Sequence, residues 1–151
     1  MNNREDFKLH GAMTVVLRKG NGEIEVTHKD NAIVASGFDF VCDALAKSVG
    51  RPGVLSHIAV GTGTNAVNAT TDSALQTQLG ARIAATYNHV AGTKVFTIAC
   101  SLAAGTYTGA ITESGVFNDP AAGIMLDRVV FPVVNKGADD SMDITFTFTL
   151  S

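Results

Sequence analysis

The chain has 151 residues and a net charge of −3, and 46% of its residues are apolar while only 17% are charged. This length fits one domain with its own core, and the scattered lysines and arginines argue against a primary role in nucleic-acid binding. No apolar run approaches the ~20 residues of a transmembrane helix, and the polar N-terminus lacks the apolar region of a secretory signal. Because the charged share is below the typical ~25%, we expect either a thick core or a surface that neighbours in an assembly partly cover.

The first predicted elements are a polar arm at residues 1–8 and a β-hairpin. Residues 9–19 and 24–28 read as two strands with alternating side chains. The Gly-Asn-Gly-Glu sequence at 20–23 joins them, and Asn-Gly tolerates the positive φ angles that tight hairpin turns require. The arm is expected to precede a single β-rich domain that spans residues 9–151.

One short helix is predicted at about residues 37–48. Ser36 offers a side-chain oxygen as its N-cap, and glycine and proline residues follow the segment. Apolar residues recur at i, i+3, i+4 and i+7, the spacing of one helical face. This predicted stripe consists of Phe38, Val41, Cys42 and Leu45.

The remainder of the chain is predicted to be nearly all β. The predicted strands are 55–60, 82–89, 93–102, 111–117, 124–134 and 142–150. Residues 61–73 read as a long polar loop and 74–79 as a short helical turn. Pro132 indicates a sheet edge or a strand end. The segment 142–150 alternates apolar residues with threonines, so one of its faces is buried and the threonine face is wet or meets another β surface.

Many short strands separated by turn signals indicate a mostly β fold. We expect an antiparallel β-sandwich or barrel, with a jelly-roll-like arrangement among the alternatives, and one helix packed on an end or face. The sequence contains neither an internal repeat nor a low-complexity tail.

The sequence predicts no catalytic, cofactor-binding or metal-binding residues. The glycine-rich stretch 61–64 lacks the lysine of a phosphate-binding loop, and the four histidines lack ligand spacing. Cys42 and Cys100 both lie among apolar neighbours and read as small core residues. The chain is therefore expected not to be an enzyme.

Glu113 is the most unusual charged residue, because it lies in a short segment with the apolar residues Ile111, Val116 and Phe117. A buried carboxylate needs hydrogen-bond partners, and we expect these to be backbone amides of a facing loop, or Arg128 or Arg82. A hydrolase acting on glycans or cell walls is an alternative. Glu113 together with Asp127 is the only candidate pair of carboxylates for such a reaction.

An ordered series of segments spans roughly residues 55–151. It comprises residues 57–64 (HIAVGTGT), 72–79 (DSALQTQL), 111–117 (ITESGVF), 125–132 (MLDRVVFP) and a closing Lys-Gly followed by alternating Ile-Thr-Phe-Thr-Phe. This series resembles small structural proteins of tailed bacteriophages, which occur among head-decoration, neck and tail-fibre or baseplate components. The resemblance implies that these residues hold the fold.

The resemblance also implies a function as a virion structural protein. A capsid decoration or cement protein that binds the major capsid shell is favoured, because the chain is short and lacks a fibrous repeat. The alternative is a tail-fibre, neck or baseplate component that binds tail or neck proteins, with receptor binding as one role. We expect a homo-oligomer in the assembled particle, synthesis in the host bacterial cytoplasm, and neither nucleic acid, membrane nor cofactor as a partner.

Overall fold

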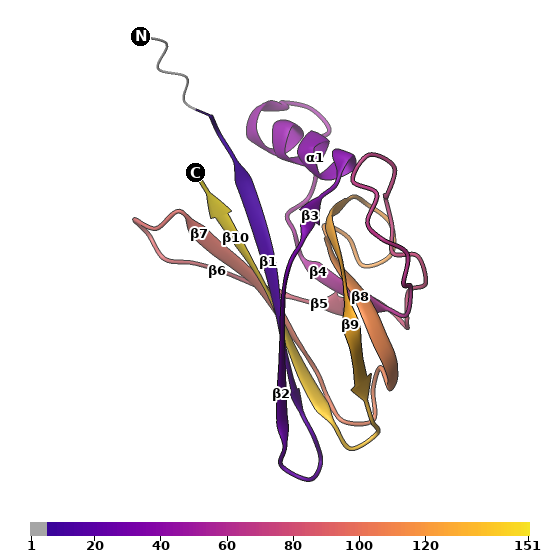
Figure 1. Cartoon of the computed structure of the whole chain (residues 1–151). Helices are drawn as coiled ribbons and strands as arrows, with labels where there is room; N and C mark the ends of the chain where they lie inside the picture. Colours follow the sequence, from indigo (N-terminus) through magenta and orange to yellow (C-terminus); the bar gives the residue numbers. More distant parts are fainter. Residues whose placement is uncertain (1–5) are drawn as a thin grey trace.

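The computed structural model describes residues 6–151 and contains two five-stranded antiparallel sheets packed face to face (Figure 1). Sheet A has the order β2 (Ile24–Asp30), β1 (Leu9–Arg18), β10 (Ser141–Leu150), β7 (Val95–Leu102) and β6 (Thr86–His89). Sheet B has the order β3 (Ala32–Ile33), β9 (Met125–Lys136), β8 (Gly109–Phe117), β4 (His57–Gly61) and β5 (Ile83–Ala84). The prediction of a β-sandwich is confirmed, and the described strands do not close into a barrel.

The strand with the strictest alternation, β10, lies at the centre of sheet A between β1 and β7. Its apolar residues Met142, Ile144, Phe146 and Phe148 are completely buried against sheet B. Burying each side chain of this size contributes about 1.5–3 kcal/mol. The prediction of a half-buried strand is therefore confirmed, and its threonines lie on the opposite face.

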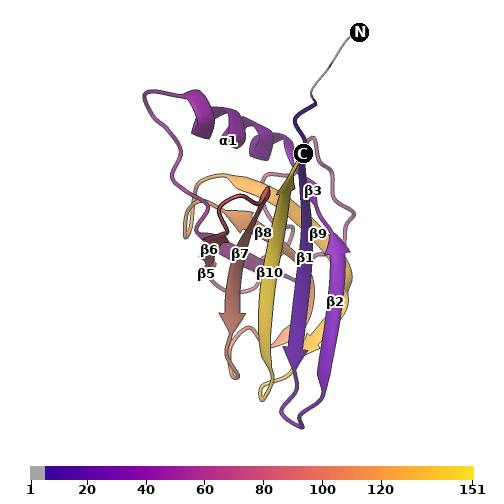
Figure 2. The ribbon, with the colours of Figure 1, turned by 90° about the vertical axis from the view of Figure 1, so that its left-hand side faces the viewer.

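The predicted β-hairpin is also confirmed, as β1 and β2. The turn closes through a hydrogen bond from Gly22 N to Lys19 O of 2.9 Å, and Gly22 has a φ of +91°, which favours glycine. Figure 2 shows that the hairpin extends past the rest of the sandwich, with β2 at the outer edge of sheet A.

The predicted strand 82–89 is wrong as a single element. It is divided into β5 in sheet B and β6 in sheet A, and the chain crosses between the sheets at Ala85, whose N–H donates to Ser56 O at 2.8 Å. The predicted helical turn at 74–79 is also wrong. That segment contains bends instead of a helical turn, and Gln78 forms an isolated bridge with Gly61.

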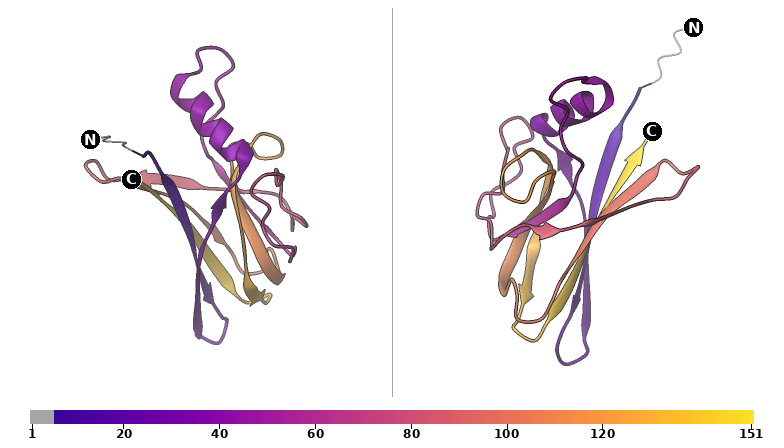
Figure 3. Two further views of the ribbon diagram at one scale, coloured as in Figure 1. Left: turned by 45° about the horizontal axis from the view of Figure 1, so that its top comes forward. Right: turned by 180° about the vertical axis from the view of Figure 1, so that it is seen from behind.

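The helix α1 spans Ala35–Ala46 and lies across one end of the sandwich (Figure 3). It begins two residues earlier than predicted, because its N-cap is Val34, and the predicted cap Ser36 instead donates its hydroxyl to Met125 O at 3.0 Å. This bond ties the first turn to β9 rather than closing the helix end. No helix among residues 6–151 has the length and apolar character to cross a membrane.

The face of α1 that meets the sandwich differs from the predicted stripe. Gly37 and Phe40 are the buried residues, whereas Phe38 and Leu45 are 53% and 76% exposed. Cys42 is exposed too, so its predicted core position is wrong, while Cys100 is buried as predicted. The helix reaches β9 through glycine, since a Cβ at residue 37 would overlap with the carbonyl of Leu126.

The Gly37→Ala substitution is therefore expected to lower the free energy of unfolding by about 1–3 kcal/mol, the usual cost of overpacking a well-packed contact. Alanine has the better intrinsic helix propensity, so a gain in stability would contradict this contact. Gly53→Ala is the matched control, because its nearest neighbouring atom lies at 3.7 Å and no strain is expected. Urea unfolding of both variants measures the difference.

Pro132 lies in β9 without ending it. The strand β3 pairs only with Asp127 and Arg128, so the later part of β9 is an edge of sheet B. At a sheet edge the missing N–H of proline breaks no hydrogen bond with a neighbouring strand, so proline is tolerated there. The expectation of a sheet edge is confirmed.

Candidate functional site

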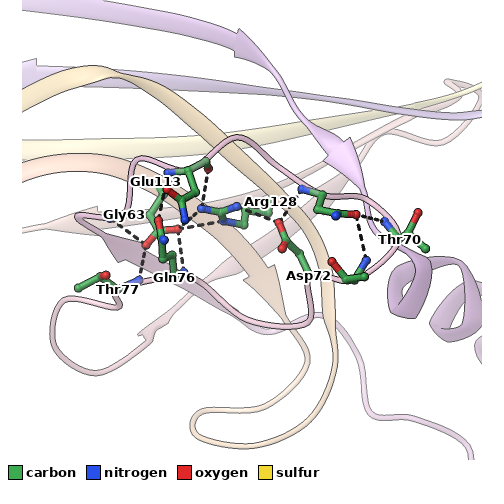
Figure 4. Close-up of polar contacts among 10 residues, drawn as sticks. Gly63, Thr70, Asp72, Gln76, Thr77, Glu113 and Arg128 are labelled. Carbon is green, nitrogen blue, oxygen red and sulfur yellow. Dashed lines mark hydrogen bonds and ion pairs between the residues drawn. The ribbon is translucent and has the colours of Figure 1, made fainter.

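Glu113, on β8, is fully buried beneath the loop that joins β4 to β5. Its Oε1 accepts hydrogen bonds from the N–H groups of Gly63 (3.1 Å) and Thr77 (2.7 Å). Its Oε2 accepts from Gln76 N at 3.0 Å and from Arg128 Nε at 2.9 Å (Figure 4). The expected partners, loop amides and an arginine, are therefore confirmed.

Arg128, on β9, extends this network to the other side of the loop. Its guanidinium is 2% exposed and pairs with the carboxylate of Asp72 at 2.8 Å and with Asn65 O at 3.1 Å. Asp72 also accepts from Asn68 N at 2.9 Å. One buried ion pair thus fixes both halves of a segment that has no regular secondary structure of its own. We call residues 62–79, held in this way, the pinned loop.

The geometry of this network suits a structural role better than catalysis. Both oxygens of Glu113 already accept at least two hydrogen bonds, so the carboxylate has little capacity left for a substrate. Arg82, the other expected partner, lies elsewhere: its guanidinium stacks on the ring of Phe117 at 3.6 Å and donates to Asp119 O. It holds the 118–123 turn rather than Glu113.

Asp127, the second carboxylate of the hydrolase hypothesis, belongs to a separate network. It is fully buried, accepts a hydrogen bond from Val116 N at 3.1 Å and contacts the amide of Asn31. Desolvation by burial raises its pKa to about 7. The hydrogen bonds of Glu113 and Asp127 share no partner, so the structure does not assemble the two into one site.

Other candidate groups also remain apart. Among residues 6–151, no three His, Cys, Asp or Glu side chains come together as a metal site would require. The stretch 61–64 includes Gly61 and Gly63, which pack against the Glu113 side chain. Its glycines thus allow the close approach of the pinned loop to β8.

The outer face of sheet A is a β surface that no other element of the described residues covers, and Figure 2 views it face on. Its central positions are half-buried and uncharged. They are Ala12, Thr14 and Val16 on β1, Thr145, Thr147 and Thr149 on β10, and Thr97 and Ala99 on β7. We call these eight residues the threonine face. An ion pair between Arg18 and Asp143 lies at one end of it.

A second apolar surface lies beside α1. The predicted helical stripe lines a groove of about 530 Å³ together with Phe7, Leu9 and their neighbours. Of the four residues in the stripe only Val41 also packs against the core, so most of the stripe forms an exposed apolar surface. Of the predicted arm, residues 1–5 lie outside the described residues, and Lys8 already pairs with Ser151 through two backbone hydrogen bonds.

Sequence reasoning missed two polar anchors. Asp72 lies in a loop without periodicity, and its pairing with Arg128 leaves no local signal. Lys136 is 2% exposed and donates to the carbonyls of Ala103 and Thr106 at 3.0 and 2.7 Å. In the sequence Lys136 precedes a glycine and two aspartates, a pattern that predicts a solvated turn.

Comparison of the chain with protein-family models, curated proteins and solved structures gives no match. The residues themselves therefore carry the functional argument. They offer two features: a loop pinned by a buried ion pair, and the threonine face.

Proposed function

We propose that the chain is a non-enzymatic structural protein of a tailed bacteriophage particle, and that it decorates the head by binding the major capsid shell. The threonine face is the observation that carries this proposal. The resemblance over residues 55–151 and the hydrogen-bonded, buried state of Glu113 support it.

The threonine face has the chemistry of a protein-binding surface. Charged residues are depleted at the centres of protein interfaces, and the eight central residues of this face carry none. Threonine and valine side chains are branched at Cβ and therefore stiff. They lose little conformational freedom when a partner surface covers them. Sheets that pack face to face lie about 10 Å apart. A β-sheet of the shell protein could pack on the threonine face in the same manner.

A charge placed in the threonine face tests the proposal. Thr147→Lys is expected to fold normally, because this side chain is half-buried on the outer face, and to reduce the copies per purified particle at least tenfold. Val133→Lys is the matched control, since Val133 is 52% exposed on a strand of the other sheet. Quantitative mass spectrometry of the particles measures the occupancy.

Absence of the native protein from purified particles would refute the virion assignment. Equal incorporation of Thr147→Lys and the native chain would refute the role of the threonine face. Electron microscopy of the particles separates head from tail. Density on the tail would favour the fibre, neck or baseplate alternative over head decoration.

A further inference from the structure

The edge strand β2 is exposed along almost its whole length. Ile24 and Val26 are 62% and 64% exposed, and the other side chains of the strand are exposed or half-buried. In sheet A, β2 pairs with β1 on one side only. Its second side is therefore a row of backbone groups available to another strand.

The hydrogen bonds between β1 and β2 show which backbone N–H and C=O groups of β2 face this free edge. Lys19 N donates to Glu23 O at 2.8 Å, and Asn31 N donates to Gly11 O at 3.1 Å. Because hydrogen-bonded pairs alternate along an antiparallel ladder, the odd-numbered residues of β2 bond to β1. The N–H and C=O groups of residues 24, 26, 28 and 30 therefore point outward.

We propose that β2 pairs with β2 of a second copy of this chain, antiparallel, about a two-fold axis at Thr27. This register places residue 24 opposite 30 and residue 26 opposite 28. These are the residues whose backbone groups point outward, so about eight hydrogen bonds form. The two sheets A then make one continuous sheet of ten strands, and their threonine faces lie side by side.

Charge complementarity selects this register. With the axis at Thr27, Glu25 of each copy lies opposite Lys29 of the other, in a non-hydrogen-bonded pair where the side chains are closest. Lys29 makes no ion pair with any residue of the described chain, whereas Glu25 already contacts Lys19 at 2.7 Å. Moving the axis to His28 places both residues opposite uncharged ones. Moving it to Val26 separates Glu25 from Lys29 and leaves Lys29 opposite Glu23, which lies in the turn outside β2.

The pairing differs from the contact in the proposed function, because it uses a strand edge and not a sheet face. It can be measured on the purified full-length chain without any virion component. Failure of one proposal therefore leaves the other intact.

Single charge reversals and their mixture test the pairing. Glu25→Lys and Lys29→Glu each place two like-charged pairs across the interface, and each is expected to raise the dimer Kd about tenfold. An equimolar mixture of the two variants restores opposite charges at both positions. Its heterodimer is expected to bind within about threefold of the native homodimer, because the rescue acts only between chains.

Glu23→Lys is the matched control. Glu23 also lies within 3.8 Å of Lys19, so the local change resembles that of Glu25→Lys, but the proposed register places it opposite Asn31. Its dimer Kd is expected to stay within about twofold of the native value. Sedimentation equilibrium measures the native chain, the three variants and the mixture, and circular dichroism verifies that they fold.

Three results would overturn the pairing. The first is a native chain that stays monomeric up to about 1 mM, a concentration at which even weak specific pairs associate. The second is a mixture of the two reversals that associates no better than either alone. The third is a Glu23→Lys variant that weakens the dimer as much as Glu25→Lys, which would indicate a general charge effect or another register.

Discussion

Arg128→Met is expected to lower the free energy of unfolding by about 3–5 kcal/mol, the range observed when one partner of a buried ion pair is removed. The substitution leaves the carboxylate of Glu113 buried without its positive partner, and it releases Asp72 of the pinned loop from β9. Urea unfolding gives the stability, and limited proteolysis reports whether residues 62–79 become accessible.

The matched control is Arg18→Met, which breaks the partly exposed pair with Asp143. An exposed pair contributes at most about 1 kcal/mol, so the two arginines are expected to differ clearly. Equal losses of stability in the two variants would show that the buried network contributes no more than a surface pair.

A double variant tests whether Glu113 and Arg128 stabilise the protein only through their ion pair or also through the bonds of Glu113 to the pinned loop. Replacing both members of a simple buried pair with apolar residues is often neutral. In Glu113→Leu/Arg128→Met, however, the N–H groups of Gly63, Gln76 and Thr77 lose their acceptor. Each unsatisfied buried group costs about 1–3 kcal/mol, so the double variant is expected to stay destabilised.

Asp127→Asn is expected to stabilise the protein above pH 7 and to leave its stability unchanged near pH 3. Burial raises the pKa of Asp127 to about 7 from the usual 3.8. Between pH 4 and 7 the unfolded chain has lost this proton while the folded chain keeps it. Stability therefore falls as the pH rises through this window, by up to about 4 kcal/mol, and then remains level.

Asparagine removes the titration and supplies a donor at the same position. The amide oxygen of Asn31 has no hydrogen-bond partner among the described residues, and a neutral residue 127 can offer it an N–H. Denaturant unfolding of both proteins from pH 3 to 9 tests this. A difference between native and variant stability that does not grow from pH 4 to 7 would refute the assignment.

Asp143→Asn is the control with the opposite sign. Its hydrogen bond from Ser101, followed by that from Arg18, lowers the pKa of Asp143. The folded chain then holds this proton less tightly than the unfolded chain, so the native carboxylate adds stability above the unfolded pKa and loses it in acid. This variant is therefore expected to be less stable than the native chain at neutral pH and equal to it in strong acid.

Much of the fold is predictable because its signals are local. The alternation in β10 identifies a half-buried strand, and the Asn-Gly turn identifies the first hairpin. The isolated glutamate among apolar residues indicates a buried, bonded Glu113. In each case neighbouring residues alone determine which face is buried or which partner type is needed.

The incorrect predictions concern contacts between backbones that are distant in sequence. The position of α1 depends on the close approach of Gly37 to the Leu126 carbonyl. The spacing of apolar residues along the sequence does not reveal such a backbone contact. The crossing at Ala85 changes sheets within an otherwise strand-like segment. The partner of Arg128 in the pinned loop lies 56 residues away, so the spacing of charges in the sequence does not reveal it.

The pairing of β1 with β10 joins residues 9–18 to residues 141–150. During synthesis the first hairpin leaves the ribosome long before β10, and until then one edge of β1 has no partner. Long-range strand pairing of this kind also slows folding to the range of milliseconds to seconds. Sheet A is therefore completed only after residue 150 has emerged, and during that interval the unpaired edge of β1 is a site at which aggregation can begin.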